Sequence, residues 1–291
     1  MKIPRKKMLS VCICGIVIAA LTGCRINQSL GETDEFTMTI EATQELPEIK
    51  TSTSTLTPEP PTPTPPPTIT RTPVPIVEYE TEAVSFTTED EYELEGILFL
   101  SEGDTAVVFA HMAGGDNNQQ NWVPFAKKSA SRGFTSLTFN FRCYGNSECG
   151  GSGSGHILTS RDIGAAVNFL RSKGFERIVC IGASMGGRAC VTAAFDQELV
   201  GLVIVSGTGS SDPDKQDLED IIRPEMRKLF IVSENDHIAD RTLAMTLLYE
   251  NAPEPKTFKL FSGSAHGTEL LDSKDRQEFM GMLFDFLEEV R

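Results

Sequence analysis

The sequence predicts an α/β fold in which a mostly parallel β-sheet is covered by helices on both faces. From about residue 79 to Arg291, stretches with the length of strands alternate with segments of helical periodicity. Two of these stretches, Leu199–Gly207 and Lys228–Ser233, are almost continuously apolar, which is typical of parallel strands that are buried on both faces. The region of about 210 residues is long enough for one sizeable domain.

The predicted elements follow one another in a regular order. Branched and aromatic residues indicate the strands, and apolar residues spaced three and four positions apart indicate the helices. In chain order we expect strands at Tyr92–Leu100 and Ala106–His111, a helix at Trp122–Arg132, a strand at Thr135–Phe141, a helix at Leu158–Lys173, a strand at Arg177–Gly182, a helix at Met185–Phe195, strands at Leu199–Gly207 and Lys228–Ser233, a helix at Asp240–Asn251, a strand at Lys256–Phe261 and a helix at Ser273–Glu289.

Residues 1–23 are predicted to be an export signal. Basic residues precede the apolar run Met8–Leu21, which has 14 residues, whereas a helix that spans a bilayer needs about 20. The run ends in Leu-Thr-Gly-Cys, which resembles the bacterial lipobox. That resemblance implies that Cys24 receives a diacylglycerol thioether and becomes the N-terminus of a lipoprotein anchored in the cell membrane. An uncleaved signal anchor is the alternative.

Residues 24–78 predict an extended stalk between this leader and the domain at residues 79–291. Proline and threonine dominate the segment Thr51–Pro75, and proline fixes φ and removes a backbone donor, which excludes a helix or a central strand. The composition is typical of a polyproline-like, O-glycosylated spacer. A flexible linker without a spacing role is the alternative.

The net charge argues against nucleic acid as a partner. The chain carries 41 acidic and 26 basic residues, which gives −15, and loss of residues 1–23 removes four positive charges and no negative ones, which gives −19. The acidic chain shows no basic patch that would bind nucleic acid phosphates. Its negative charge also does not attract anionic lipids, so any attachment to a membrane depends on the acyl chains.

Four cysteines remain once the leader and Cys24 are set aside. Outside the cytoplasm they are free to form disulfides, and Cys143 and Cys149 could pair because they lie six residues apart in a glycine-rich loop. We expect Cys180 to be a small apolar residue in a buried strand. Cys190 completes the four. Without a Cys-x-x-Cys motif or a Cys/His cluster, the sequence predicts neither a metal site nor a cofactor.

The most informative motif is Gly-Ala-Ser-Met-Gly-Gly, which follows the strand Arg177–Gly182. A serine in a tight strand-to-helix turn needs small neighbours, and Gly182 and Gly186 flank Ser184 at two residues on either side. The helix that follows would present the Met185 N–H to an oxyanion. The alternative is a phosphate-binding glycine turn, but the stretch lacks Gly-x-Gly-x-x-Gly and has no lysine after its glycines.

A nucleophilic serine needs a histidine as its base. The chain has four histidines, and His266 lies in the turn after the last strand, where sites form in parallel sheets. His156 and His237 are interpreted as solvated loop residues. His111, which ends an early strand, is expected to form hydrogen bonds beneath the loop that follows it.

The histidine in turn needs a carboxylate, and Asp236 lies in the turn after the strand Lys228–Ser233. Glu234 and Asp240 remain competitors. The order Ser184, Asp236, His266 then completes a catalytic triad.

A second oxyanion donor is expected in the loop His-Met-Ala-Gly-Gly. Gly114 and Gly115 allow the backbone to approach a ligand closely. We expect the Ala113 N–H to be the donor, with the Met112 N–H as the alternative.

Residues 79–291 resemble the α/β-hydrolase-fold serine hydrolases. The resemblance rests on HMAGG, where the family commonly has HG-x-G-G, on FNFRCYGNS, where it often has D-x-R-G-x-G-x-S, and on GASMGG, Asp236 and AHG. It implies that an acyl-enzyme forms on Ser184 and is hydrolysed by water. Met112 and Cys143 stand where the family pattern has glycine.

The segment Thr208–Arg227 is too short for a large cap, so we expect little or no cap domain and an open site. That favours esters of small or medium acyl groups, on small molecules or on polysaccharide, over long-chain lipids. The sequence therefore predicts a carboxylic-ester hydrolase on the outer face of the cell membrane. A serine peptidase of the same fold and a non-catalytic binding lipoprotein are the alternatives.

Overall fold

The structure is a computed structural model and describes residues 76–149, 158–209 and 226–291. The predicted leader, Cys24 and nearly all of the stalk lie outside these ranges and stay predictions. His156 and most of the segment Thr208–Arg227 also lie outside them. Within the described ranges, no helix has both the length and the apolar character that a membrane crossing requires.

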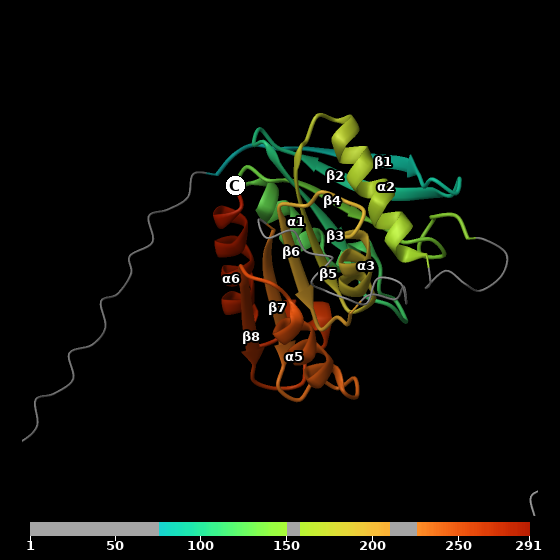
Figure 1. The fold of residues 1–291 in the computed structure, drawn as a ribbon. Coiled ribbons are helices and arrows are strands. Elements are labelled where there is room, and N and C mark those ends of the chain that lie inside the picture. Colours follow the sequence, from blue (N-terminus) through green and yellow to red (C-terminus); the bar gives the residue numbers. More distant parts are fainter. Residues whose placement is uncertain (1–75, 150–157, 210–225) are drawn as a thin grey trace, which may run out of the picture. The chain divides into compact units, whose positions relative to one another are not determined.

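Eight strands form one sheet in the order β1-β2-β4-β3-β5-β6-β7-β8 (Figure 1). The first two strands and β4 pair antiparallel, and all the other pairs are parallel. The mostly parallel α/β sheet that the sequence predicts is therefore confirmed. The strands are β1 Glu80–Thr87, β2 Glu93–Leu100, β3 Thr105–Ala110, β4 Thr135–Phe139, β5 Arg177–Ala183, β6 Gly201–Val205, β7 Arg227–Ser233 and β8 Lys256–Phe261.

Helices cover both faces of the sheet (Figure 1). One face packs against α1 and α6, and the other packs against α2, α3 and α5. The helical elements are η1 Gln119–Asn121, α1 Val123–Ala130, α2 Thr159–Ser172, α3 Met185–Ala193, α5 Arg241–Asn251, η3 Gly267–Leu271 and α6 Arg276–Glu289.

The two central strands explain why one sheet can support two cores. Every residue of β3 is buried, as is all of β5 except its first residue. Because successive side chains of a strand point to opposite faces, Val107 and Val179 enter the α1/α6 core while Val108 and Cys180 enter the other. Strands of this kind have no polar face, which accounts for their continuous apolar runs.

Strand β1 was not predicted, and its exposure explains why. Only Phe86 among its eight residues is buried, so the sequence lacks an apolar alternation that would mark a strand. Strand β6 is shorter at both ends than the predicted Leu199–Gly207, and it ends at Val205 because Ser206 adopts φ 49° and leaves the extended region. The last helix begins at Arg276 rather than at Ser273, after the unpredicted turn η3. The other predicted elements agree with the observed ones to within two residues.

Candidate active site

Ser184 occupies a strained turn between β5 and α3. Its φ of 50° and ψ of −110° are unfavourable for a residue with a side chain. The turn is held on both sides, because the Ser184 N–H donates to the Val205 carbonyl at 2.8 Å and the Arg188 N–H donates to the Ser184 carbonyl at 3.0 Å. Ser184 is half-buried and lies at the carboxyl edge of the sheet.

Close backbone contacts explain the glycines around Ser184. A Cβ atom at Gly182 would lie 2.4 Å from the Gly186 backbone, and one at Gly186 would lie 2.3 Å from the Ala110 carbonyl oxygen. Neither position can carry a side chain without moving the backbone. The tight packing also places the first turn of α3, with Met185 as its first residue, against the end of β3.

Asp236 and His266 form a hydrogen-bonded pair at the ends of β7 and β8. The His266 Nδ1 lies 2.8 Å from Asp236 Oδ1 and 3.0 Å from Oδ2, and the Asp236 side chain is closed off from solvent. A second hydrogen bond reaches Oδ1 from the Ile238 N–H at 3.0 Å. Because Nδ1 donates to the carboxylate, the neutral ring presents Nε2 as an acceptor. Nε2 has no hydrogen-bond partner among the described residues.

Opposing effects act on the pKa of Asp236. Burial alone would raise this pKa, but the hydrogen bond from His266, the Ser206 hydroxyl and the Ile238 N–H together outweigh burial and lower the pKa below its ordinary value. The carboxylate therefore stays ionised beside the imidazole. A fixed negative charge at this place stabilises the imidazolium form that a general base acquires when it takes a proton.

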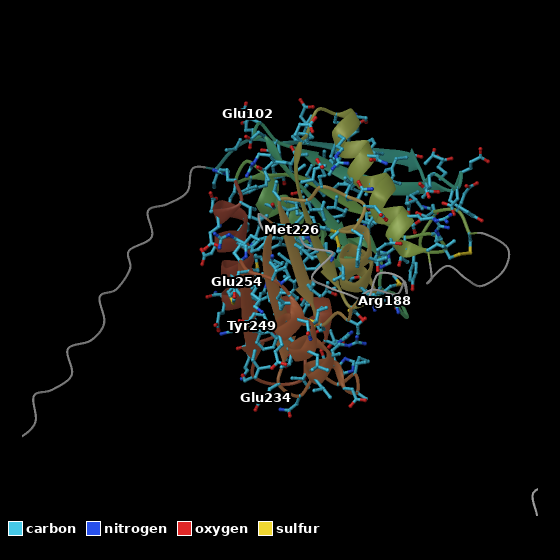
Figure 2. All side chains as sticks on the ribbon, in the orientation of Figure 1. Glu102, Arg188, Met226, Glu234, Tyr249 and Glu254 are labelled. Carbon is cyan, nitrogen blue, oxygen red and sulfur yellow. A yellow bond between two sulfur atoms is a disulfide. The ribbon has the colours of Figure 1, made fainter. Side chains whose placement is uncertain are left out.

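The competing carboxylates are placed differently. Glu234 lies at the surface beyond the end of β7 (Figure 2). Asp240 is exposed and adopts the left-handed conformation just before α5, with φ 60°. Among the described residues, neither of these side chains forms a hydrogen bond with His266, whereas both carboxylate oxygens of Asp236 do.

The loop of His266 lies against both other parts of the site. A Cβ at Gly267 would lie 3.0 Å from Met112 Sδ and 3.3 Å from Ala183 Cβ. Gly267 follows His266 directly, and Ala183 precedes Ser184. The structure thus brings the predicted base, the predicted nucleophile and the predicted oxyanion loop together at one edge of the sheet.

His111 fixes the direction of the peptide group that carries the Ala113 N–H. Its Nδ1 lies 2.8 Å from the Met112 carbonyl oxygen, and its Nε2 accepts from the Phe141 N–H at 3.2 Å. A trans peptide places its C=O and N–H on opposite sides, so the Ala113 N–H points away from His111. That N–H donates to no described residue. The expectation that His111 forms hydrogen bonds beneath the loop is confirmed.

The surroundings of His111 keep its ring neutral. The ring is fully buried, and burial lowers the pKa of His111 to about 4, although the hydrogen bond to the Met112 carbonyl opposes the shift. One ring nitrogen donates and the other accepts, which matches the neutral tautomer. His111 is therefore a structural link between the loops after β3 and β4.

His237 is exposed in a loop, as expected, but it also has a partner that the sequence did not indicate. Its Nε2 lies 3.2 Å from the Glu269 carboxylate, and its ring centroid lies 5.5 Å from that of His266. Glu269 in turn accepts a hydrogen bond from the His266 N–H at 2.8 Å. The turns after β7 and β8 lie side by side because these strands are parallel neighbours. The sequence indicates the closeness of His237 to the site only by placing it directly after Asp236.

The four cysteines in the described ranges form two disulfides. Cys143 and Cys149 are bonded, as the loop spacing suggested. The expectation for Cys180 is corrected: the residue is buried, but it is bonded to Cys190, with Cα atoms 6.0 Å apart. The chain reverses sharply at Ser184, so α3 packs back along β5 and brings the two cysteines together.

A buried ion-pair network that the sequence reasoning missed holds the loop after β4. Arg142 donates to Asp162 at 2.8 Å through Nε, and its two terminal nitrogens reach Asp90 at 2.9 and 3.0 Å. Burial would lower the pKa of Arg142, but the hydrogen bonds to Asp90 and Asp162 outweigh burial and raise it. The neighbouring Phe141 N–H donates to His111, so the network also supports the loop after β3.

The family of the chain follows from its sequence. Residues 103–282, more than half of the chain, match the sequence model of the family described as "Alpha/beta hydrolase domain". The chain therefore belongs to the alpha/beta hydrolase family. No curated protein matches it.

Several solved structures share the fold at low sequence identity. An esterase from Pyrococcus furiosus is 19% identical with a TM-score of 0.58, and the match covers 72% of this chain and 93% of that one. A serine hydrolase without a lid from Xanthomonas campestris is 17% identical with a TM-score of 0.58, covering 74% and 97%. An esterase from Exiguobacterium antarcticum is 12% identical with a TM-score of 0.56, covering 71% and 100%. Identities this low show a common fold.

Proposed function

We propose that this alpha/beta hydrolase cleaves carboxylic esters of small or medium acyl groups through an acyl-enzyme on Ser184. The observation that carries the proposal is the buried Asp236–His266 pair, which lies at the same edge of the sheet as a serine in a strained turn. The His266 Nε2 has no hydrogen-bond partner in the described part of the chain. The esterases among the similar structures are consistent with this chemistry.

In the proposed reaction, His266 Nε2 takes the hydroxyl proton as Ser184 Oγ attacks the ester carbonyl carbon. The negative charge that develops on the carbonyl oxygen is stabilised by the N–H groups of Ala113 and Met185 and by the N-terminus of α3. The C–O bond to the alcohol then breaks, and Nε2 returns the proton to the leaving oxygen. Water repeats the sequence on the acyl-enzyme, which releases the acid and restores the Ser184 hydroxyl.

The test of this proposal is the Ser184→Ala variant. The wild-type protein should hydrolyse p-nitrophenyl acetate and react with a fluorophosphonate probe, and Ser184→Ala should do neither while remaining folded. If the folded wild-type protein showed neither hydrolysis nor labelling, the proposed enzymatic activity would be refuted. A wild-type protein that prefers an amide over the matching ester would indicate the peptidase alternative.

We also propose that Cys24 carries fatty acyl chains that hold the enzyme on the outer face of the cell membrane. The proposal rests on the basic start, the short apolar run and the Leu-Thr-Gly-Cys ending of the leader. Cys24→Ser should release active enzyme into the soluble fraction of the producing cells. Retention of this variant in the membrane would point to an uncleaved signal anchor.

A further inference from the structure

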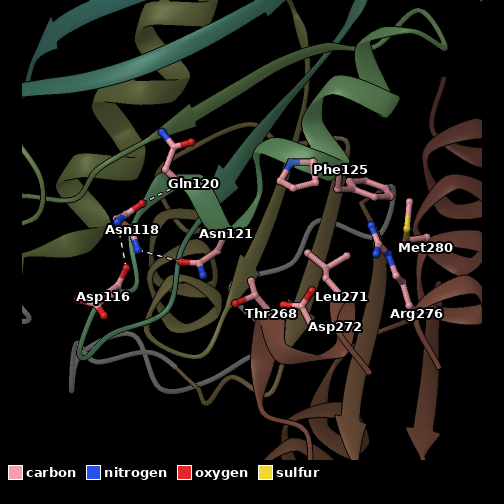
Figure 3. A pocket seen from close by; sticks show the side chains of 11 residues that line it. Asp116, Asn118, Gln120, Asn121, Phe125, Thr268, Leu271, Asp272, Arg276 and Met280 are labelled. Atoms are coloured by element: carbon pink, nitrogen blue, oxygen red, sulfur yellow. Dashed lines mark hydrogen bonds between the residues drawn. The ribbon is translucent and has the colours of Figure 1, made fainter. Parts of the chain in front are cut away.

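A pocket of about 260 Å³ lies between two segments, one that follows the loop after β3 and one that follows His266 (Figure 3). One wall is formed by the segment from Asp116 through η1 to the start of α1, and the other by η3 and the start of α6. Asp116 in the first wall lies three residues after Ala113, and Thr268 in the second wall lies two residues after His266. The two loops that lead into these walls are in contact, because a Cβ at Gly267 would lie 3.0 Å from Met112 Sδ.

The pocket has an apolar floor and a polar rim. Phe125, Leu271 and Met280 form the floor and are buried. Exposed side chains from both walls form the rim; they include Asp116, Gln120, Asp272 and Arg276. An apolar base with a few polar groups around it is the usual composition of a small-molecule site.

Several polar groups of the pocket have unused hydrogen-bonding capacity. The Thr268 hydroxyl is buried and has no partner among the described residues, although buried polar groups are nearly always paired. The Arg276 side chain makes no hydrogen bond or ion pair within the described ranges. Asn121 uses its Oδ1 to accept from the Asn118 N–H at 2.9 Å, which leaves its Nδ2 as a donor.

The first wall is held rigid before any ligand arrives. Asn118 Oδ1 accepts from the Gln120 N–H at 2.8 Å, and its Nδ2 donates to the Asp116 carbonyl at 3.0 Å (Figure 3). The Gln119 N–H donates to Asn140 Oδ1 at 2.8 Å, which ties η1 to the end of β4. A prearranged wall loses little conformational entropy when a ligand binds.

The charges of the pocket favour a neutral ligand rich in hydroxyl groups. Two carboxylates, Asp116 and Asp272, face one guanidinium, Arg276, so an anion meets net repulsion and a cation leaves Arg276 unmatched. A hydroxyl group both donates and accepts, and it can satisfy carboxylates, amides and guanidinium together. The volume is below the roughly 300 Å³ of pockets for drug-sized ligands, so it suits a single sugar ring better than a long chain.

The position of the pocket decides which part of an ester it holds. In acyl transfer the histidine gives its proton to the leaving oxygen, so the alcohol part of the substrate must lie on the side of His266. The second wall of the pocket follows His266 in the chain. We propose that it binds a sugar unit whose hydroxyl is esterified, and that sugar esters are therefore the substrate class of the enzyme. This inference rests on the proposed ester hydrolysis at Ser184.

The test compares two esters that share an acetyl group and an alkyl leaving oxygen. Methyl 6-O-acetyl-α-D-glucopyranoside has the sugar unit, and ethyl acetate lacks it. Arg276→Ala and Asn121→Ala should each raise the KM for the sugar ester about tenfold, because each loses a hydrogen bond to the sugar. The rates with ethyl acetate should change less than twofold. Lys274→Ala, which removes an exposed cation outside the pocket, is the matched control and should change neither substrate.

Thr268→Val gives a readout that a purely structural residue would not give. It removes an unpaired buried hydroxyl at nearly constant volume, so it should raise the Tm while it raises the KM for the sugar ester. A rise in both quantities supports a hydroxyl kept for a ligand. A higher Tm with an unchanged KM would remove Thr268 from the site.

The experiments distinguish failure of the sugar-binding proposal from failure of the proposed ester hydrolysis. If wild type hydrolyses both esters and the pocket variants leave the KM for the sugar ester unchanged, the pocket is refuted and the esterase stands. If wild type hydrolyses neither ester, Ser184→Ala is titrated with methyl α-D-glucopyranoside by saturation-transfer NMR. Binding that Arg276→Ala abolishes supports the pocket on its own, and no binding overturns it. Tighter binding of the corresponding glucuronide would overturn the assignment to neutral sugars.

Discussion

His111 and His266 lie at the carboxyl ends of two parallel strands and are both buried, yet their partners give them opposite chemistry. The Nδ1 of His266 donates to the carboxylate of Asp236, and its Nε2 has no partner in the part of the chain that the structure describes. The Nδ1 of His111 donates to a neutral carbonyl, and its Nε2 is already occupied by the Phe141 N–H. Burial is thus common to both residues and does not make either of them a base.

The difference lies in two requirements. A general base needs one free ring nitrogen, and it needs a charge that stabilises the proton it receives. His266 meets both, whereas His111 meets neither, and its pKa of about 4 keeps it neutral. The neutral ring of His111 serves instead to orient the peptide group that presents the Ala113 N–H.

The largest expected effect comes from removing the charge beside His266. Asp236→Asn should lower kcat for p-nitrophenyl acetate about 10⁴-fold, because an amide favours the wrong tautomer and cannot stabilise imidazolium. The matched control is Asp240→Asn, since asparagine tolerates the left-handed conformation found there. This control should keep kcat within twofold. A larger loss at Asp240 than at Asp236 would contradict the pairing seen with His266.

The second prediction concerns the free energy of unfolding, which should depend on pH because His111 is neutral in the folded protein. Its pKa falls from 6.5 to about 4 on folding, so the unfolded chain binds a proton before the folded one does. The free energy of unfolding should therefore decrease as the pH falls from 6.5 to 4, by about 3 kcal/mol from this residue. His111→Gln should remove that part of the pH dependence, because glutamine can donate and accept without titrating.

Urea unfolding followed through Trp122 measures the effect. Trp122 is the chain's single tryptophan and is fully buried, so its emission reports on the domain. Wild type and His111→Gln are unfolded in parallel at each pH between 4 and 6.5. An equal slope in wild type and His111→Gln would show that His111 is not held neutral.

The fold and the placement of the candidate site residues on neighbouring loops could be predicted, because both depend on patterns that are local in sequence. Apolar runs mark the parallel strands, and such strands bring their carboxyl ends to one edge. A reader of the sequence can therefore place Ser184, Asp236 and His266 on neighbouring loops. The short distance between Asp236 and His266 follows from that arrangement.

What could not be predicted depends on side chains that meet across loops. The contact of His237 with Glu269 requires the register of β7 against β8. The Cys180–Cys190 bond requires the angle at which α3 packs on β5. Strand β1 is missed for another reason: it is an exposed edge strand whose pairing with β2 leaves no apolar pattern.

Variants of His237 should have the smallest effect on kcat, and they test what holds His266 in place. His237 packs edge-to-face on the His266 ring, and Glu269 links the His237 ring to the His266 N–H. Because the ion pair of His237 and Glu269 is about half-exposed, it contributes only about 0.2–1 kcal/mol. His237→Ala removes both the ion pair and the ring contact, and it should lower kcat at most about fivefold with KM unchanged.

His237→Phe separates these two contributions, because it keeps the ring packing and removes the ion pair. If the packing positions His266, His237→Phe should restore most of the kcat lost in His237→Ala, and fluorophosphonate labelling rates should follow the same order. Equal losses in both variants would assign the effect to the ion pair. An unchanged kcat in His237→Ala would show that Asp236 alone is sufficient to orient His266, which would reduce the difference between His266 and His111 to a single carboxylate.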